Sequence, residues 1–332
     1  MPTTFAILGS GGWGTAIAVL LAQKGGYEVR LWSAHAEAAR HLKETRENAR
    51  LLPGVRIPDS VTITDDPAIA VAGADCWVTA IPTAYLRATI ARFSLLRSAD
   101  VPLVSLTKGL EVGTFHRPTE ILGEVLKTDR LAVLSGPSHA EEVARGLPTS
   151  VVVAAADLEL AVWVQQHFGT DRFRVYTNAD SLGVELAGAL KNVIGIAAGV
   201  CDGLGFGDNA KAALLTRGVV EMTRFGVAHG AEHETFHGLA GMGDLITTCF
   251  SPHGRNRRLG YRLGKGEPLA DVLAGPQVAE GVLTSRSVFE RTTRMGLDMP
   301  IMTGVYRVLH EGQPPLAAVQ DLMTRRQKQE RN

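Results

Sequence analysis

The chain has 332 residues, enough for two domains or one large one with a sizeable hydrophobic core. Hydrophobic residues make up 45% and charged residues 20%, a composition that excludes a largely disordered chain. Lys+Arg and Asp+Glu number 34 each, which argues against a nucleic-acid or anionic-membrane binder because such a protein needs a positive surplus. A local basic pocket for a small anion remains compatible with this balance.

Cysteine usage and the first residues bear on the compartment. Cys76, Cys201 and Cys249 are far apart and odd in number, so neither a disulfide framework nor a cysteine zinc site is expected, and a reducing cytosol fits. The opening TTFAILGSGG has no basic lead-in, and no apolar run approaches the roughly 20 residues that a membrane span needs. We therefore predict a cytoplasmic protein without a membrane span.

Residues 1–180 alternate short β-branched runs with longer helical patterns. Because the runs are apolar without alternation, they predict a mostly parallel sheet covered on both faces, in a doubly wound Rossmann-type α/β domain. The predicted strands are Thr4–Leu8, Glu28–Trp32, Val61–Thr64, Cys76–Ile81, Pro102–Leu106, Leu131–Leu134, Ser150–Ala154 and Arg174–Tyr176. The predicted helices are Gly14–Lys24, Ala34–Ala49, Tyr85–Phe93, Arg117–Leu126 and Leu158–Phe168.

Residues 181–332 show no convincing strand pattern and predict an all-helical C-terminal domain. There is no low-complexity linker between the halves, so we expect them to pack tightly, with the ligand site in the cleft between them. The helical segments are predicted at 181–201, 208–228, 234–239, 255–264, 268–274, 284–294, 301–311 and 314–323.

The glycine-rich segment GSGGWG, residues 9–14, follows the first predicted strand and opens the first predicted helix. This context is the one that a dinucleotide-binding fingerprint requires. Gly9 permits the tight turn, Gly11 lets backbone N–H groups approach a pyrophosphate, and Gly14 lets the helix pack close to the strand. The helix N-terminus favours the anion, so we predict a bound dinucleotide rather than a merely flexible turn.

The end of the second predicted strand bears on the choice of cofactor. NAD enzymes usually have Asp or Glu there to bind the ribose 2′-OH, whereas this chain reads LWSAH. Ser33, His35 and Arg40 are instead placed to accept a 2′-phosphate. We therefore favour NADPH over NADH, with use of both left open, and an ordinary loop as the structural alternative.

Three later loops combine strand ends with small and polar residues: 80–83, 105–111 and 135–140. Ligands of open parallel sheets bind beyond the carboxyl ends of the strands, so these loops are expected to share one crevice with the glycine turn. Lysine accounts for only 8 of the 34 basic residues, which makes Lys108 after its apolar strand conspicuous. Its alternative role is that of a solvated loop lysine.

Lys191 lies in a long apolar segment, with Ala187, Gly188, Ile194 and Gly195 as its neighbours on a helix. An ammonium group there either extends to solvent from a packed helix or points at a ligand. Desolvation lowers the pKa of a lysine, which suits proton exchange with a carbonyl/alcohol pair.

The segment GMGDLITT, residues 241–248, leads into GRNRR, residues 254–258. Asp244 is a candidate to orient Lys191. Arg255 and Asn256 can supply donors to a phosphate, whereas Arg257 and Arg258 fit a structural or solvated role better. His229 and His233 have the spacing of a metal pair, but no third ligand is evident, so no metal is predicted.

Taken together, the chain resembles the bacterial NAD(P)-dependent glycerol-3-phosphate dehydrogenases. The resemblance implies a cytoplasmic enzyme, expected to be a homodimer, that interconverts dihydroxyacetone phosphate and sn-glycerol 3-phosphate for phospholipid synthesis. The matching segments, in order between residues 9 and 281, are GSGGWGTAIA, LTKGLE, SGPSHAEEVARGLPT, VELAGALKNVIGIAAGVCDGLGFGDNAKAALLTRG, GMGDLITTC, GRNRRLG and VAEG.

The resemblance also implies roles for individual residues. Lys191 matches the proton acceptor, and Lys108 matches a residue that contacts both substrate and cofactor. Other matches on the substrate side are Gly136, Ser138, Asn192, Asp244, Thr248, Gly254, Arg255 and Asn256. Matches on the cofactor side are Gly12, Trp13, Ala140, Arg255, Val278 and Glu280.

Two departures from the family pattern and two rival functions stay open. Bacterial members commonly have serine where this chain has Gly254, and often a basic residue where it has Ala34 beside His35. A dehydrogenase of the same plan that acts on a hydroxy acid or hydroxyacyl thioester is the nearest rival enzyme. A dinucleotide-sensing protein without turnover is the non-enzymatic rival, and intact Lys108, Lys191 and Asp244 argue against it.

Overall fold

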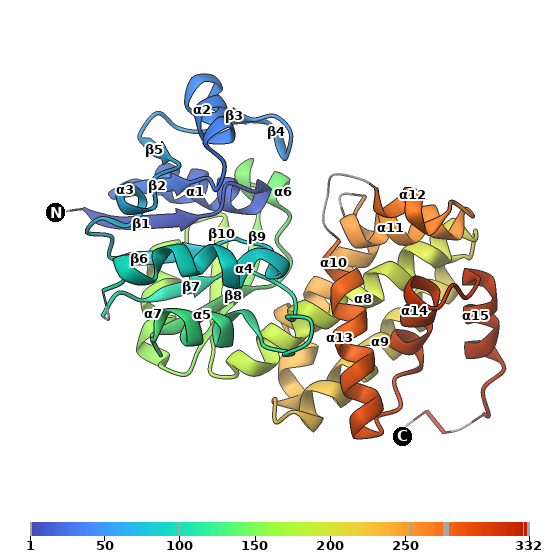
Figure 1. Ribbon diagram of the computed structural model, residues 1–332. Coiled ribbons are helices and arrows are strands. Elements are labelled where there is room, and N and C mark those ends of the chain that lie inside the picture. The colour runs from blue at the N-terminus through green and yellow to red at the C-terminus, as the bar shows by residue number, and fades with distance from the viewer. Residues whose placement is uncertain (1, 99, 253, 275–278, 328, 331–332) are drawn as a thin grey trace.

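The computed structural model describes every residue except 1, 99, 253, 275–278, 328 and 331–332. A sheet-containing part and a helical part lie side by side, with the N-terminal end on the first and the C-terminal end on the second (Figure 1). The last strand ends at Asn178 and the long helix α8 begins at Ser181. Among the described residues after Asn178 none belongs to a strand, as predicted.

The sheet has eight strands in the order β10-β9-β8-β7-β6-β1-β2-β5, and every one of them coincides with a predicted strand to within a few residues. All neighbouring pairs are parallel except β8–β9, which is antiparallel, so the sheet is mostly parallel as predicted. The bounds are β1 Thr3–Leu8, β2 Tyr27–Trp32, β5 Val61–Thr64, β6 Cys76–Thr79, β7 Leu103–Ser105, β8 Leu131–Ser135, β9 Thr149–Ala155 and β10 Phe173–Asn178.

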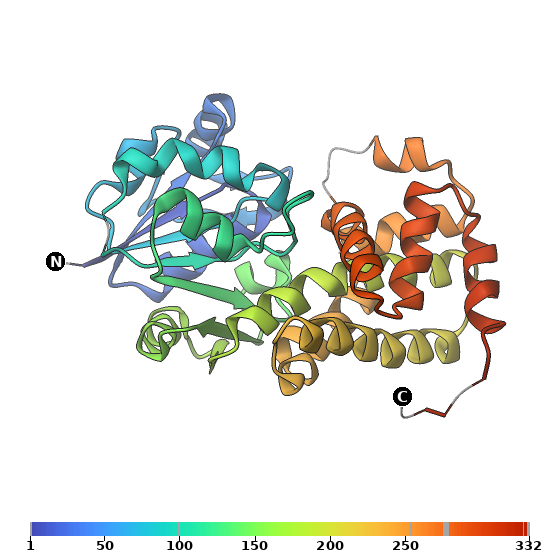
Figure 2. The same ribbon diagram turned by 60° about the horizontal axis from the view of Figure 1, so that its bottom comes forward.

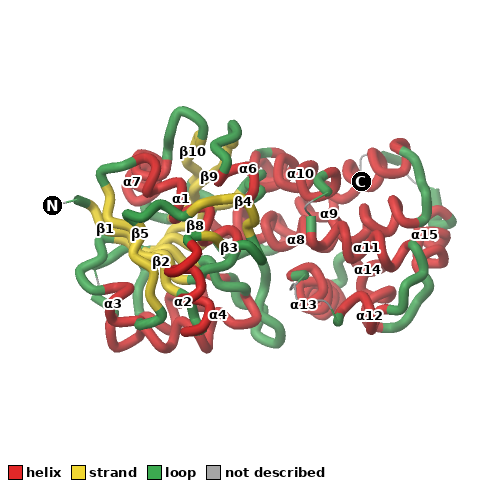
Figure 3. The backbone as a smooth tube through the Cα atoms, turned by 90° about the horizontal axis from the view of Figure 1, so that it is seen from above, coloured by secondary structure: helices red, strands yellow, loops and turns green. Residues whose placement is uncertain are grey.

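Successive residues of β1 enter different hydrophobic clusters, so both faces of the sheet are buried. Phe5 and Ile7 pack with α1, α6 and α7 on one face, whereas Ala6 and Leu8 pack with α3, α4 and α5 on the other. The tube in Figure 3 shows the strands lying between these helices. Their bounds are α1 Gly12–Lys24, α3 Pro67–Val71, α4 Thr83–Ile90, a 3₁₀ turn Ala91–Leu96, α5 Pro118–Leu126, α6 Ala140–Ala144 and α7 Leu158–Phe168; α3 and α6 are absent from the prediction.

The predicted helix Ala34–Ala49 is wrong at both ends. Helix α2 covers only Ala36–Thr45, because Arg46 adopts a left-handed conformation with a φ of 52° and ends it. The chain then forms an antiparallel hairpin of β3 (Glu47–Asn48) and β4 (Leu52–Arg56), which the sequence analysis missed.

Helix α8, Ser181–Gly203, is the centre of the helical part, and Figure 2 shows it running out from beside the sheet. It is long and apolar enough to cross a membrane by composition, but 94% of its most apolar stretch is buried inside the protein. Glycines let α11 approach it: a Cβ on Gly199 or on Gly260 would lie 1.9 Å from a backbone carbonyl of the other helix. Helix α8 is therefore the core of this part.

The remaining helices surround α8 and mostly match the predicted segments. Helix α10 was not predicted, α13 begins four residues earlier than expected, and the segment predicted at 234–239 is a 3₁₀ turn followed by a π-helical turn. The bounds are α9 Asp208–Ala228, the 3₁₀ turn η2 His233–His237, the π turn η3 Leu239–Gly243, α10 Asp244–Phe250, α11 Arg255–Gly264, α12 Leu269–Leu273, α13 Glu280–Met295, α14 Pro300–His310 and α15 Pro315–Met323.

Candidate functional site

The glycine turn between β1 and α1 has the geometry of a phosphate cradle. Gly9 has a φ of +124°, and a Cβ there would lie 2.7 Å from the carbonyl oxygen of Ala80. A Cβ on Gly14 would lie 1.9 Å from the carbonyl oxygen of Gly9, so helix α1 packs against the turn without any side chain between them. In contrast, the space beside Gly11 is open. The backbone at the N-terminus of α1 can therefore be approached closely, as a pyrophosphate requires.

A buried indole and the β3–β4 hairpin complete this cradle. The indole Nε1 of Trp13 is buried and has no hydrogen-bond partner within the described part of the chain. The amide of Asn48, on the unpredicted hairpin, donates to the carbonyl of Ser10 at 2.9 Å and to the hydroxyl of Thr15 at 3.0 Å. A Cβ on Gly12 would lie 2.6 Å from the carbonyl of Leu51. The hairpin thus braces the turn, and the residues present fit a bound dinucleotide.

The end of β2 places the residues expected at the adenosine ribose. Ser33 is buried, and its hydroxyl donates to the carbonyl of His35 at 3.4 Å. His35 itself is exposed at the N-cap of α2, and Arg40 is exposed one turn into that helix. The side chains of His35 and Arg40, rather than that of Ser33, are therefore the ones that a ligand at this strand end can reach.

The centre of the candidate site is a carboxylate that bridges two lysines. The ammonium of Lys191 donates to Asp244 Oδ1 at 2.6 Å and to the hydroxyl of Thr248 at 2.7 Å. The ammonium of Lys108 donates to Asp244 Oδ2, also at 2.6 Å, and to the carbonyl of Gly136 at 3.0 Å. The structure thus brings together three residues that the sequence analysis singled out separately, from α8, from the loop after β7 and from α10.

Burial and charge set the acidity of this group. Burial lowers the pKa of Lys191 to about 8, because the attraction of Asp244 offsets only part of the desolvation and Lys108 repels the ammonium. For Asp244, burial acts to raise the pKa, but the two ammonium groups outweigh it and hold the pKa below its ordinary value. Asp244 is therefore an anion, and the lowered pKa of Lys191 lets its ammonium release a proton more readily than an ordinary lysine does.

The loops after β6, β7 and β8 lie against one another and against the glycine turn. The hydroxyl of Thr107 donates to the carbonyl of Ile81 at 2.8 Å, which joins the first two loops. In the third loop, the Gly136 carbonyl accepts from Lys108 and also from the Ser138 hydroxyl, at 2.8 Å. Ala140 begins α6, and its Cβ lies 3.8 Å from where a Cβ on Gly12 would be.

The residues predicted to bind a phosphate begin helix α11. Arg255 is exposed on the first turn of α11, whereas Asn256 is buried. The Asn256 amide donates to Asn192 at 2.9 Å, and its carbonyl oxygen accepts the backbone N–H of Gly281 at 3.0 Å. Asn256 therefore also joins α8, α11 and α13. A Cβ on Gly254 would lie 3.0 Å from the carbonyl of Thr248, so glycine fits the close approach at this position.

Glu280 connects the helical part to the sheet. Its buried carboxylate accepts the backbone N–H of Thr83 at 3.1 Å, at the N-terminus of α4. A Cβ on Gly109 would lie 2.8 Å from the same carboxylate, which places Glu280 directly beside the Lys108 loop. Burial raises the pKa of Glu280 to about 7. Val278, the other residue predicted in this segment, lies outside the described residues.

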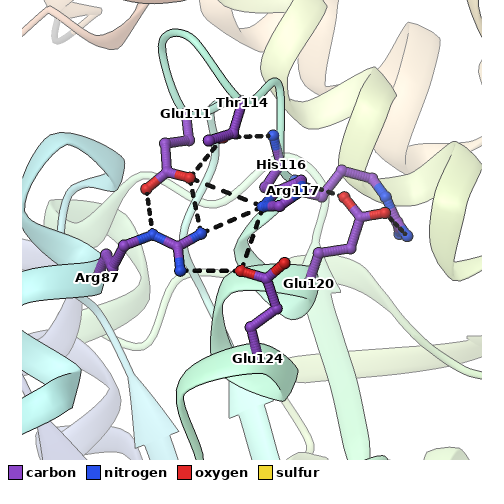
Figure 4. A network of polar contacts seen from close by, with 7 residues as sticks. All are labelled: Arg87, Glu111, Thr114, His116, Arg117, Glu120 and Glu124. Carbon is purple, nitrogen blue, oxygen red and sulfur yellow. Dashed lines mark hydrogen bonds and ion pairs between the residues drawn. The ribbon is translucent and has the colours of Figure 1, made fainter.

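The loop that follows Lys108 is held by a polar network (Figure 4). Arg87 of α4 contacts Glu111 through two hydrogen bonds of 2.8 Å and forms an ion pair with Glu124 at 2.9 Å. Arg117 binds the buried carboxylate of Glu185 at 2.7 Å, and Glu185 lies on α8, less than two turns before Lys191. The network thus fixes the Lys108 loop relative to the helix that carries Lys191.

Three further residues considered from the sequence, His229, His233 and Arg257, contact other protein groups. His229 stacks on Phe225 and accepts from Arg291 at 3.3 Å, whereas His233 stacks on His237. Arg257 forms an ion pair with Asp202 at 2.6 Å, which confirms the structural role expected of it. The sequence analysis missed Asn48 and Glu185, both buried polar residues whose partners are distant in the chain.

Fold and site together define a class: a dinucleotide-dependent oxidoreductase whose Rossmann-type sheet and helical part meet at a lysine–aspartate centre. The family described as NAD-dependent glycerol-3-phosphate dehydrogenase matches residues 4–161 with its N-terminal part and residues 180–320 with its C-terminal part. This chain therefore belongs to the NAD-dependent glycerol-3-phosphate dehydrogenase family. As a member of it, the chain is an oxidoreductase that acts on CH–OH groups with NAD(H) or NADP(H).

Individual relatives agree with this assignment. The chain is 51% identical over 328 residues to a glycerol-3-phosphate dehydrogenase [NAD(P)+] of Chlorobium phaeobacteroides, covering 98% of each chain. It is 48% identical over 330 residues to one of Geobacillus thermodenitrificans, covering 98% of this chain and 96% of the relative. The crystal structure of glycerol-3-phosphate dehydrogenase from Coxiella burnetii superposes with a TM-score of 0.92 at 38% identity, covering 97% and 99% of the two chains.

Proposed function

We propose that this chain interconverts dihydroxyacetone phosphate and sn-glycerol 3-phosphate in the cytoplasm, running as the reduction that supplies glycerophospholipid synthesis. The observation that supports this most strongly is the bridge from Asp244 to Lys108 and Lys191, at 2.6 Å each. Lys191 is buried, and its pKa of about 8 suits a group that both gives and takes a proton. A protein that only senses dinucleotides would not need such a group.

When bound, the cofactor would supply hydride chemistry at C2 of the substrate through its nicotinamide. Lys191 donates a proton to the ketone oxygen during reduction and takes it from the hydroxyl during oxidation. Asp244 holds the ammonium of Lys191 toward this oxygen, and Lys108 polarises the same oxygen by its charge. Thr248, Gly136 and Ser138 are proposed to complete the substrate side. Thr248 accepts from Lys191, the Gly136 carbonyl accepts from Lys108, and Ser138 donates to the same carbonyl.

Arg255 and Asn256 are proposed to bind the substrate phosphate, with Asn192 beside them. Arg255 is exposed, and its guanidinium offers a bidentate fork. Gly254 contributes backbone only, next to the carbonyl of Thr248. A phosphate held at this end fixes C2 against the ring of the cofactor, which lowers the entropic cost of the reaction. A hydroxy acid without a phosphate would leave Arg255 unused.

The cofactor is proposed to lie along the carboxyl ends of the strands. Its pyrophosphate would bind at the N-terminus of α1, where the space beside Gly11 is open and the unpartnered indole N–H of Trp13 lies buried in the same turn. His35 favours NADPH because it is exposed at the ribose end. The remaining contacts are proposed for Gly9, Gly12, Gly14, Ser33, Lys108, Ala140, Arg255, Val278 and Glu280.

We further propose that residues 1–180 form the cofactor domain, that residues 181–332 form the substrate domain, and that the active enzyme is a homodimer. The boundary is supported by the end of β10 at Asn178 and by the start of α8 at Ser181. Contacts of Glu185 with Arg117 and of Glu280 with Thr83 cross it on either side of the crevice. The homodimer rests on the family resemblance.

The experiment that tests the proposed function follows the nicotinamide absorbance of purified protein with dihydroxyacetone phosphate and either NADPH or NADH. We expect rapid oxidation of the cofactor that depends on the substrate phosphate, with dihydroxyacetone as the matched control. The ratio of the two cofactor rates tests whether the β2 end accepts a 2′-phosphate. No oxidation by folded, cofactor-bound protein would refute the proposal, and a 2-hydroxy acid or 3-hydroxyacyl substrate would then be tested in the same assay.

A further inference from the structure

Asp244 follows directly on a π-helical turn, Leu239–Gly243. The N–H of Gly243 donates to the carbonyl of Gly238, five residues earlier, at 3.1 Å. Such turns are rare and occur frequently at functional sites, because they change the direction in which the next side chain leaves the helix. The geometry of this turn therefore determines the direction in which the Asp244 side chain leaves helix α10.

The π turn packs against Phe236. A Cβ on Gly241, in the middle of the turn, would lie 2.0 Å from the Phe236 carbonyl oxygen and 2.5 Å from its Cα. The ring of Phe236 is fully buried against α9, where a Cβ on Gly226 would lie 2.0 Å from Cζ. Gly226 of α9 therefore lies against the ring of Phe236, and Gly241 of the turn lies against its backbone. Neither glycine leaves room for a methyl group.

The same segment is tied to the helix that carries Lys191. Asp180 accepts the backbone N–H of Gly183 at 2.7 Å and so caps the N-terminus of α8. Its second oxygen accepts the hydroxyl of Thr235 at 2.7 Å and the N–H of Glu232 at 2.9 Å. One buried carboxylate therefore holds the segment of Phe236 in register with the helix of Lys191.

A pocket lies beside the start of the π turn. It has a volume of about 440 Å³ and is lined by Leu239 and Ala240 of the turn, by Gly238 and Thr235 before it, and by residues of β9 and β10. Ala240 itself is only 1% exposed and belongs to the core of the helical part, so the turn is well packed and only borders the pocket at its first residues. A shift of the Phe236 backbone would therefore reach Gly241 and, through the turn, Asp244.

We propose that Phe236 is a positioning residue that sets the Asp244 carboxylate between Lys108 and Lys191. This inference rests on the proposed function, since the carboxylate matters there as the group that orients the proton donor. Phe236 touches neither lysine. It acts through the backbone of Gly241 and the pitch of the turn.

The test compares Phe236→Leu with Phe168→Leu, a fully buried phenylalanine in the sheet core, remote from the turn. For Phe236→Leu we expect kcat for glycerol 3-phosphate oxidation to fall by about 10- to 100-fold, the range that a small misplacement of a catalytic group produces. The rising limb of its pH–rate profile should move to lower pH, because Asp244 acts to raise the pKa of Lys191. Phe168→Leu should keep the wild-type kcat and profile despite a comparable core cavity.

A titration of isotope-labelled lysine by NMR gives a readout that needs no turnover. We expect Lys191 to titrate at lower pH in Phe236→Leu than in the wild type, and at the wild-type pH in Phe168→Leu. An unchanged titration of Lys191 in folded Phe236→Leu, or equal losses of kcat in the two variants, would overturn the inference. Phe236→Met, whose unbranched side chain adapts to an irregular gap, serves if Phe236→Leu does not fold. Failure of the wild type to reduce dihydroxyacetone phosphate would instead refute the proposed function and leave this titration valid.

Discussion

Replacing Asp244 by asparagine keeps the shape of the centre but removes the charge that holds Lys108 and Lys191 together. Both ammonium nitrogens lie 2.6 Å from the carboxylate, on different oxygens. At a charge separation of about 4 Å and an effective dielectric constant of about 20, the Asp244 carboxylate attracts the Lys191 ammonium by about 4 kcal/mol. The pKa of about 8 already includes the repulsion by Lys108, so Asp244→Asn changes it by the loss of this attraction. That loss favours release of the Lys191 proton by a factor of about 1,000.

The consequence is a loss of reduction that depends on pH. Starting from a pKa of about 8, Lys191 carries its proton in most wild-type molecules at neutral pH. With the factor above, Asp244→Asn should lose about 90-fold in the rate of dihydroxyacetone phosphate reduction at pH 7, but only about 4-fold near pH 5.5.

The assay for Asp244→Asn is the pH dependence of kcat for reduction, with NADPH saturating and with cofactor affinity measured alongside by fluorescence. The decisive quantity is the ratio of wild-type to variant kcat at each pH. A ratio that stays constant across the pH range would refute the argument, because it would mean that Asp244 does not act through the protonation of Lys191.

Three further predictions follow from single contacts. Gly9→Ala should weaken NADPH binding at least about 10-fold in a fluorescence titration, because a Cβ there would lie 2.7 Å from the Ala80 carbonyl and the φ of +124° is strained for alanine; unchanged affinity would contradict the cradle. Arg255→Gln should reduce the preference in kcat/KM for dihydroxyacetone phosphate over dihydroxyacetone by about 10- to 100-fold, the effect of one charged hydrogen bond; a retained preference would place the phosphate elsewhere. Burial raises the pKa of Glu221 from 4.5 to about 7, so the native state keeps a proton that the unfolded chain releases, and the free energy of unfolding falls by up to about 3 kcal/mol between those two pH values. Urea titrations should therefore show the free energy of unfolding of Glu221→Gln rising relative to that of the wild type as the pH rises from about 5 to about 8. A difference in unfolding free energy that stays constant with pH would refute this assignment.

The sheet was predictable because each of its strands is an apolar run between turn residues. The direction of β9 was not predictable, because Ser150–Ala154 is apolar on both faces. Its sequence looks the same whether the strand runs parallel or antiparallel to β8. The β3–β4 hairpin was missed because Glu47–Asn48 is only two residues long and continues an amphipathic helical pattern. What ends that pattern is the left-handed backbone of Arg46, a tertiary choice that composition does not signal.

The site was predictable one residue at a time but not as an assembly. Lys191 stood out as a charge on an apolar helix face, and Asp244 as an acid in a glycine-rich segment. That one carboxylate bridges Lys191 to Lys108 is a fact of packing. Phe236 gave no signal at all, because a buried phenylalanine is ordinary. Its importance appears only where glycine backbones press on it from two sides.

Replacing Lys191 by alanine tests whether this lysine exchanges the proton of the reaction. Turnover of dihydroxyacetone phosphate and NADPH fluorescence would be measured on the same preparation, with wild-type protein as the reference. We expect kcat to fall about 100-fold or more with NADPH affinity retained, because general acid–base catalysis contributes that much and Lys191 is not expected to hold the cofactor. Wild-type turnover in Lys191→Ala would contradict the assignment of Lys191 as the proton donor and acceptor.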